Sequence, residues 1–266
     1  MKIGIVGCSG RMGRMLITAV KERREAELAA GTELANSDSI GLDLGTLVGI
    51  QPLGAIVGSD PEILFAAVDC VIDFTNPQAT VNHAQLAKET GTSLVIGTTG
   101  LDEVHLKSLQ EAGSSAAVVY SGNMSLGINI LLGLVEQIAR SLSSDYDIEV
   151  LEMHHKHKID APSGTALMLG RAAAKGRGIV SEGNSVISRV GEVGPRPSGA
   201  IGYATLRGGD VIGEHSVIFA GAGERIELTH KANDRALFAK GAVHAALWTK
   251  GQAPGLYTMG NVLGLN

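Results

Sequence analysis

The first 122 residues alternate short apolar runs with segments of helical spacing, and this alternation is the feature that most limits how the chain can fold. A strand followed by a helix and another strand normally forms a right-handed crossover, which leaves the two strands parallel. We therefore predict an α/β fold with a doubly wound parallel sheet. Residues 35–60 give no clear pattern. The predicted strands cover 2–7, 26–33, 68–74, 92–97 and 116–122, and the predicted helices cover 10–24, 77–91 and 101–113.

The pattern changes after the last of these strands. A long apolar helix is expected at 125–142, and strand-like segments separated by glycine turns at 200–232 look like antiparallel sheet. We predict a first domain at 1–124, to which 235–266 returns, and a smaller α+β domain at 125–234 with a mixed, largely antiparallel sheet. The remaining predicted elements are a strand at 146–155 and helices at 163–176 and 235–251.

Composition and charge exclude several classes of protein. The net charge of −5 over 266 residues argues against nucleic acid or an anionic membrane as the main partner. Two cysteines, Cys8 and Cys70, form neither a disulfide framework nor a zinc spacing, and they fit a reducing compartment. The apolar run after Met1 is too short for a signal peptide, and no stretch approaches about 18 apolar residues. We expect a cytoplasmic protein.

The turn after the first predicted strand is rich in glycine. In the segment VGCSGRMG, Gly7, Gly10 and Gly13 let backbone N–H groups approach a pyrophosphate at the N-terminus of the following helix. The strict G-x-G-x-x-G spacing is not kept. However, Glu33 ends the second strand, where an acidic group can accept a hydrogen bond from a ribose hydroxyl. These features predict a Rossmann-like dinucleotide site, and the alternative is a glycine turn without a ligand.

Small polar residues follow three other predicted strands, in GTTG (97–100), in YSGNMS (120–125) and in DFTNP (73–77). Ligands of doubly wound sheets bind beyond the carboxyl ends of the strands, so the first two loops would border a nicotinamide. The alternative is that both are ordinary turns. In the third, Asp73 or Thr75 would cap the helix that begins near residue 77.

The segment EMHHKHKIDAPSGTA (152–166) gathers titratable groups just before a predicted helix. A metal site is one interpretation, but neighbours on a strand point to opposite faces, so His154 and His155 do not readily share one ion. This alternation also places His154 on the face of Ile148 and Val150. A second interpretation is a solvated polar loop whose serine or threonine caps the helix.

A third interpretation of this segment is an anion-binding and proton-transfer site. Lys156 and Lys158 supply positive charge, and the N–H groups at the start of the helix can bind a carboxylate. A histidine at the end of a strand can exchange protons near neutral pH. Together with a nicotinamide domain, these features indicate reduction of a small polycarboxylate.

The segment EVLEMHHKHKIDAPSGTA resembles the signature of the 4-hydroxy-tetrahydrodipicolinate reductase family, also called dihydrodipicolinate reductase. The resemblance covers essentially the whole chain, because other motifs follow the order of the family. These motifs are VGCSGRMG, DFTNP, GTTG, GNMS, RGGDVIGEH and LTHKANDRALFAKGAVHAALW.

The resemblance implies an NADH- or NADPH-dependent reductase of lysine biosynthesis by the diaminopimelate route. It would convert 4-hydroxy-2,3,4,5-tetrahydrodipicolinate, a dicarboxylate, to tetrahydrodipicolinate, as a homotetramer built through the sheet of the second domain. It implies that His154 donates or accepts a proton and that Lys158 donates one, with no metal. Substrate-binding positions are His155, Gly164 and Thr165. Cofactor contacts are Gly7, Cys8, Ser9, Gly10, Arg11, Met12, Glu33, Gly97, Thr98, Thr99, Ser121, Gly122, Asn123 and Met124.

The chain departs from the family at Leu34, where some members carry an arginine after the acidic residue. Because Glu33 would repel a 2′-phosphate and no cation follows it, we expect a preference for NADH or the use of both cofactors. Two other functions stay open. One is an NAD(P)-dependent dehydrogenase of another small amino or imino acid, and the other is a catalytically inactive nucleotide-sensing protein.

Overall fold

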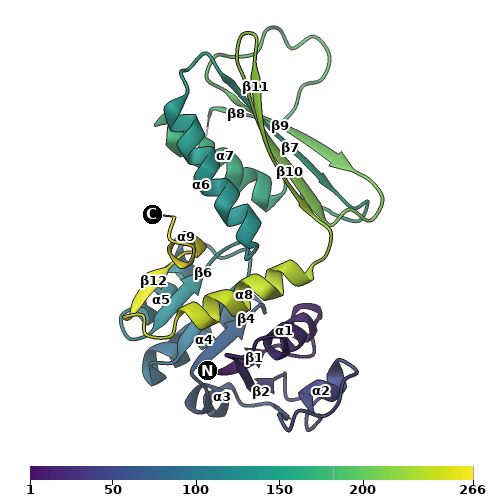
Figure 1. The fold of residues 1–266 in the computed structure, drawn as a ribbon, viewed down its shortest axis with the longest axis vertical. Helices are drawn as coiled ribbons and strands as arrows, with labels where there is room; N and C mark the ends of the chain where they lie inside the picture. The colour runs from purple at the N-terminus through teal and green to yellow at the C-terminus, as the bar shows by residue number, and fades with distance from the viewer. Residues whose placement is uncertain (182, 266) are drawn as a thin grey trace. The chain divides into compact units, whose positions relative to one another are not determined.

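The computed structural model describes residues 1–181 and 183–265, which fold into two compact units (Figure 1). Unit 1 contains Met1–Leu126 and Ala236–Gly264, and unit 2 contains Gly127–Arg235 and Leu265. The chain therefore leaves unit 1 after its first 126 residues and returns to it at Ala236.

Within the described residues, unit 1 holds a seven-stranded sheet in the order β12-β6-β5-β4-β1-β2-β3, and every neighbouring pair is parallel. The doubly wound parallel sheet predicted from the alternation is confirmed. Two short strands were not predicted, β3 in the stretch without a clear pattern and β12 near the end of the chain. The strands are β1 (Lys2–Val6), β2 (Glu27–Thr32), β3 (Val57–Gly58), β4 (Cys70–Asp73), β5 (Ser93–Ile96), β6 (Ala117–Tyr120) and β12 (Gly255–Tyr257).

Helices cover both faces of this sheet. On one face Ile5 of β1 packs in one core with Leu16 of α1 and Val243 of α8. On the other face Val71 of β4 packs in a second core with Leu109 of α5. The helices of unit 1 are α1 (Arg11–Lys21), α2 (Leu44–Leu47), α3 (Pro61–Ala67), α4 (Pro77–Thr90), α5 (Glu103–Ala112), α8 (Ala236–Trp248) and α9 (Met259–Val262).

Unit 2 holds a five-stranded mixed sheet in the order β11-β10-β7-β9-β8 among its described residues. Strand β10 is antiparallel to β7 and β11, whereas β9 is parallel to β7 and β8. The predicted mixed sheet is confirmed, but β9 does not pair with β10, because β7 lies between them. The elements are α6 (Leu126–Ser141), β7 (Asp147–His154), α7 (Gly164–Arg177), β8 (Ser185–Val186), β9 (Ile201–Arg207), β10 (Gly213–Ala220) and β11 (Arg225–Ala232).

Strand β7 runs through the middle of this sheet and alternates strictly between buried and more exposed residues. Its apolar residues Ile148 and Val150 pack in one core with Val135 of α6 and Leu169 of α7. His154 ends the strand on this buried face, as the alternation predicted. The sequence pattern of β7 therefore turns two polar side chains, those of residues 152 and 154, toward the interior of unit 2.

Candidate functional site

A cavity of about 450 Å³ opens in unit 1 beyond the carboxyl ends of β1, β2 and β4. Gly7, Gly10 and Glu33, which the sequence predicted as cofactor contacts, line it together with Thr75 and His83. Ligands of doubly wound sheets bind at this edge, because the strand order reverses there and the loops diverge. The cavity is therefore the candidate dinucleotide site.

The glycine turn at this cavity has the geometry that close approach to a phosphate requires. Gly7 has a φ of 66°, a conformation that other residues rarely adopt. Gly10 is the N-cap of α1 and provides no side-chain hydrogen bond to the first turn of that helix. Because the backbone N–H groups of a first helical turn lack intrahelical partners, they can donate to a pyrophosphate.

Glu33 contacts the glycine turn directly. Its Oε1 atom accepts hydrogen bonds from the backbone N–H of Ser9 (2.8 Å) and from the Ser9 hydroxyl (2.7 Å). The following residue, Leu34, is 75% exposed. Arg14 donates from Nε to the carbonyl oxygen of Ser9 (2.8 Å) and from Nη1 to that of Leu47. The acidic group thus lies at the edge of the cavity, and the guanidinium of Arg14 is engaged with backbone oxygens.

The other predicted cofactor residues differ in what they can offer. The side chains of Cys8, Thr98 and Met124 are buried, so contacts to a cofactor would come from their backbone atoms. Burial also raises the pKa of Cys8 to about 12, which keeps the thiol protonated. Ser121 donates its hydroxyl to the carbonyl oxygen of Asn123 (2.7 Å) and so shapes that loop. Arg11, Thr99 and Gly122 are exposed, and Met12 and Gly97 are partly buried.

Asp73, at the end of β4, joins the loop that follows β4 to the loop that follows β5. It is fully buried and lies 2.8 Å from Nδ1 of His83. It accepts hydrogen bonds from the hydroxyls of Thr75 (2.6 Å), Thr80 (2.9 Å) and Thr98 (3.2 Å). Burial would raise the pKa of Asp73, but the hydrogen bond and charge of His83 hold it below its usual value.

The prediction that Asp73 or Thr75 caps the next helix is wrong. Asn76 is the N-cap of α4, and its side chain accepts from the backbone N–H of Ala79 (3.0 Å). Asp73 instead faces the interior, because β4 is buried along its whole length.

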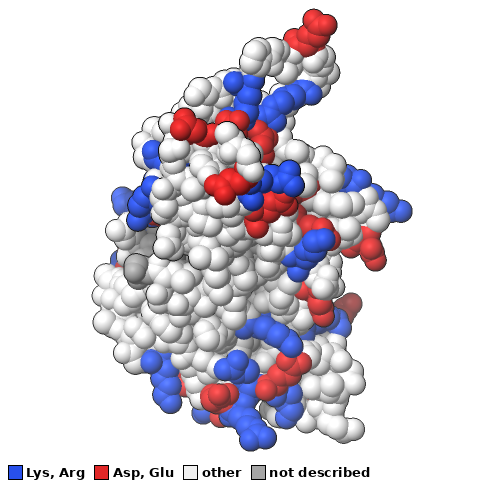
Figure 2. All heavy atoms as spheres, turned by 45° about the horizontal axis from the view of Figure 1, so that its top comes forward, with Lys and Arg blue, Asp and Glu red and all other residues white. Residues whose placement is uncertain are grey.

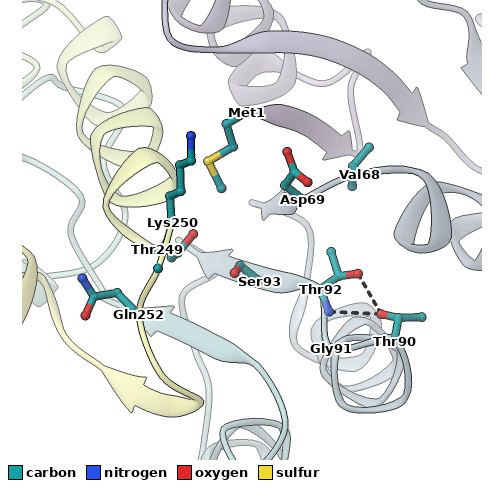
Figure 3. Close-up of a pocket in the computed structure, with 11 residues that line it drawn as sticks. Met1, Val68, Asp69, Thr90, Gly91, Thr92, Ser93, Thr249, Lys250 and Gln252 are labelled. Carbon is teal, nitrogen blue, oxygen red and sulfur yellow. Dashed lines mark hydrogen bonds between the residues drawn. The ribbon is translucent and has the colours of Figure 1, made fainter.

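Unit 1 has a second hollow of about 490 Å³, at the amino ends of its parallel strands (Figure 3). Met1, Asp69 and Lys250 border it, and hydrogen bonds join Thr90 to Thr92 beside it. None of its lining residues belongs to the predicted site. Its position at the amino ends of the strands separates it from the dinucleotide cavity.

The second candidate site lies in unit 2, at the end of β7. His154 is 8% exposed, and its Nδ1 atom lies 2.5 Å from Oε2 of Glu152. Both side chains point to the buried face because the two residues are separated by one position on the strand. Burial lowers the pKa of His154, although the hydrogen bond and charge of Glu152 partly oppose this.

Glu152 is the centre of a buried polar network. It is 1% exposed, and both of its oxygens accept from the guanidinium of Arg207, at 2.8 and 3.0 Å. Its Oε1 also accepts from the backbone N–H of Ser163 (3.2 Å) and from the hydroxyl of Thr205 (3.3 Å). Burial would raise the pKa of Glu152, but Arg207 and His154 hold it below its usual value, so the carboxylate is ionised.

His215 joins this network from β10. Its ring centroid lies 5.0 Å from that of His154 in an edge-on arrangement, and its Nε2 lies 3.0 Å from the hydroxyl of Ser163. Burial lowers the pKa of His215 to about 4, so this imidazole is neutral at physiological pH. Sequence reasoning assigned no role to Arg207 or His215, although both fall in the family motif RGGDVIGEH.

The remaining predicted residues follow the end of β7 along the chain, up to the first turn of α7. Lys158 lies 2.6 Å from Oδ1 of Asp160, and its side chain is 21% exposed. His155 follows the end of β7, and its backbone N–H donates to the carbonyl oxygen of Val211 (2.6 Å). Gly164 and Thr165 are the first two residues of α7, directly after its N-cap, Ser163.

Three features of the structure bear on a metal ion, a membrane and nucleic acid as partners. In residues 1–181 and 183–265, no group of three His, Cys, Asp or Glu side chains could hold a metal ion. No helix of this described part is both long and apolar enough to span a membrane. On the face drawn in Figure 2, basic and acidic side chains are interspersed rather than gathered in one basic patch.

Comparisons with known proteins agree over the whole chain. Two family models match it, "Dihydrodipicolinate reductase, N-terminus" over residues 1–124 and "Dihydrodipicolinate reductase, C-terminus" over residues 127–263. The 4-hydroxy-tetrahydrodipicolinate reductase 1 of Mesorhizobium japonicum is 53% identical over 267 residues, covering 100% of this chain and 98% of that protein. The 4-hydroxy-tetrahydrodipicolinate reductase of Brucella abortus is 51% identical and covers 100% of both chains.

A solved structure shares the fold. The dipicolinate-bound dihydrodipicolinate reductase from Paenisporosarcina sp. TG-14 matches with a TM-score of 0.77 and 22% sequence identity, covering 97% of each chain.

Proposed function

The chain belongs to the dihydrodipicolinate reductase family, and we propose that its two candidate sites together reduce 4-hydroxy-tetrahydrodipicolinate to tetrahydrodipicolinate with NADH or NADPH. It is an NAD(P)H-dependent oxidoreductase of the lysine pathway. The observation that carries the assignment is the match of both family models, which together span residues 1–124 and 127–263. The reaction adds one hydride and one proton to the substrate and releases water.

Unit 1 is the proposed dinucleotide-binding domain. The glycine turn and the start of α1 would hold the pyrophosphate, and Glu33 would accept from the adenosine ribose. A bound nicotinamide dinucleotide would supply the hydride. The exposed side chain of Leu34 and the engaged guanidinium of Arg14 support a preference for NADH or the use of both cofactors.

Unit 2 is the proposed substrate-binding domain. We assign the proton of the reaction to His154, which lies at the end of a central strand and carries a carboxylate partner. Lys158 would leave Asp160 and pair with a substrate carboxylate, and it is the second candidate donor of that same proton. Gly164 and Thr165, with His155, would bind the dicarboxylate at the N-terminus of α7.

Unit 2 is also the proposed site of assembly into a homotetramer. Its sheet has one face covered by α6 and α7, while Leu151 and Met153 of β7 and Ile218 of β10 are partly exposed on the other face. Leu206 of β9, which pairs with Met153, is 47% exposed. Partly exposed apolar side chains on an open sheet face are typical of an interface between subunits. We also propose a cytoplasmic location, with which the two free, buried cysteines agree.

One assay tests the reaction. Purified protein is mixed with NADH and freshly prepared 4-hydroxy-tetrahydrodipicolinate, and the loss of NADH absorbance is followed. We expect rapid oxidation with this substrate and slow oxidation with a panel of other oxo and imino acids. Faster turnover of one of those acids would favour another dehydrogenase, and nucleotide binding without any oxidation would favour a sensing protein.

A further inference from the structure

We infer that Glu152 is a positioning residue that fixes the tautomer of His154 and thereby leaves Nε2 of that imidazole as the atom that exchanges the proton. The inference rests on the proposed role of His154 and extends it to an atom and to a second residue. Glu152 is 1% exposed, and its Oε2 lies 2.5 Å from Nδ1 of His154. An ionised carboxylate only accepts hydrogen bonds, so Nδ1 carries the hydrogen and Nε2 of the neutral ring is unprotonated.

The carboxylate of Glu152 has no freedom to turn away from the histidine. Arg207 donates to both of its oxygens, and Ser163 and Thr205 donate to Oε1. Such a two-point pairing with a guanidinium fixes the plane of the carboxylate as well as its position. Oε2 is therefore held within hydrogen-bond distance of the Nδ1 atom of His154.

The same network ties the acid to the proposed anion site. Ser163, whose backbone N–H reaches Glu152, is the N-cap of α7, and its side chain accepts from the backbone N–H of Ala166 (3.2 Å). The proposed substrate positions Gly164 and Thr165 follow it directly. One buried carboxylate thus sets the geometry between the proton donor and the helix end that would bind a substrate carboxylate.

Space beside Nε2 is consistent with this orientation. A Cβ atom on Gly213, the first residue of β10, would lie 3.0 Å from Nε2 of His154. That distance is shorter than ordinary van der Waals contact, so a side chain at 213 would press on the atom that we assign to proton exchange. Glycine at this position avoids that contact.

The variant Glu152→Gln tests the inference, because an amide cannot serve all the present donors. Its NH₂ group cannot replace Oε1, which faces the N–H of Ser163, the Thr205 hydroxyl and Arg207. At the position of Oε2, the NH₂ group would face only Arg207 and His154. In that orientation the NH₂ group would donate a hydrogen bond to Nδ1 of His154. The substitution should therefore move the hydrogen of His154 from Nδ1 to Nε2.

The direct measurement is ¹⁵N NMR of the protein with labelled histidines, where the signals of His154 are those lost in His154→Gln. We expect the Nδ1–H tautomer in the wild type and a shift toward Nε2–H in Glu152→Gln. Turnover should fall by at least about tenfold, because the imidazolium that donates the proton carries hydrogens on both nitrogens and would lose the carboxylate that accepts from Nδ1. The variant would thus forfeit part of the roughly 10²–10⁴-fold that acid catalysis supplies. The KM for NADH should not change, and the limb of the kcat–pH profile that belongs to His154 should move to lower pH.

Glu136→Gln is the matched control, since Glu136 also lies in unit 2 and pairs with cations, Arg140 and Lys175, outside this network. It should leave the His154 signals, the pH profile and kcat unchanged within about twofold. An Nε2–H tautomer in the wild type would overturn the inference even if Glu152→Gln failed to fold. Unchanged His154 signals and turnover in a folded Glu152→Gln would overturn it as well.

Failure of the proposed function would look different. If His154→Gln kept normal turnover, the role of His154 in the reaction would be wrong, whatever its tautomer. If His154→Gln lost turnover while Glu152→Gln did not, only the inference about Glu152 would fail.

Discussion

Ser9 and Glu33 are joined by two hydrogen bonds, from the backbone N–H and the hydroxyl of Ser9 to the same carboxylate oxygen, at 2.8 and 2.7 Å. The bonds connect the glycine turn to the end of β2, on the lining of the dinucleotide cavity. The second oxygen of Glu33, Oε2, accepts a hydrogen bond from the backbone N–H of Leu34 (3.3 Å). In the proposed binding mode, a negative charge is thus held where NADH and NADPH would differ.

This charge leads to a prediction about cofactor choice. A 2′-phosphate would meet the carboxylate of Glu33, and Arg14 already donates to two backbone carbonyl oxygens. We expect kcat/KM for NADH to equal or exceed that for NADPH. A value at least about tenfold higher for NADPH, worth about 1.4 kcal/mol, would contradict the prediction.

A single substitution should shift that preference. Leu34 is 75% exposed, so Leu34→Arg would add a cation beside the ribose without disturbing the core. We expect kcat/KM for NADPH to rise relative to NADH by about tenfold, the effect of one charge-assisted hydrogen bond of about 1.4 kcal/mol. Ile63→Arg, at another exposed apolar position of unit 1 (69% exposed), is the control and should leave the ratio unchanged. An unaltered ratio in Leu34→Arg would place the ribose elsewhere.

The buried carboxylate of Asp73 should contribute to stability in a pH-dependent way. Its pKa is held below the usual value, so the contribution is present above the unfolded-state pKa and is lost as the pH falls through the lower folded-state pKa. Asp73→Asn should reduce the free energy of unfolding at pH 7 by about 3 kcal/mol, because it breaks a buried pair. The difference from the wild type should shrink below the unfolded-state pKa of 3.8.

Urea unfolding of wild type and Asp73→Asn at pH 7 and near pH 3 provides the measurement. The exposed Asp38 supplies the control variant Asp38→Asn, which should match the wild type at both values. A loss of stability that stayed the same at both pH values would show that the charge of Asp73 is not the cause.

Lys158 should affect both binding and turnover. It lies 2.6 Å from Asp160 and can exchange this partner for a substrate carboxylate. We expect Lys158→Met to raise the KM for the substrate and to lower kcat, whereas Lys156→Met, at an exposed neighbour, should change both by less than about threefold. Equal effects of the two variants would indicate a general attraction of the substrate rather than a specific contact.

Much of unit 1 could be predicted from local patterns. The longer strands of its sheet are apolar runs, and α4 is bounded by signals that act over a few residues, Pro77 at its start and Gly91, with a φ of 72°, at its end. The N-cap of α4, Asn76, was not predicted. The short β12 gave no such signal, because it is three residues long and is fixed by its pairing with β6. Its position depends on contacts with residues more than a hundred positions earlier.

The candidate site in unit 2 shows the same division. The alternation of β7 was enough to place His154 on the buried face. The partnership of Glu152 and Arg207 could not be predicted, because it depends on the parallel register of β7 and β9, in which Glu152 lies opposite Thr205. The register between two strands about fifty residues apart cannot be read from a single sequence. The alternation of buried and exposed residues along one strand, with its period of two, can be.

The central claim is that His154 supplies the proton, and the most direct test compares His154→Gln with His157→Gln at saturating NADH. His154 is buried at the end of β7, whereas His157 is exposed. A group that acts only in the transition state should affect turnover more than binding, so His154→Gln should lower kcat by about 10²–10⁴-fold with little change in KM. His157→Gln should remain close to the wild type. Near-normal turnover in His154→Gln together with a crippled His157→Gln would contradict the account.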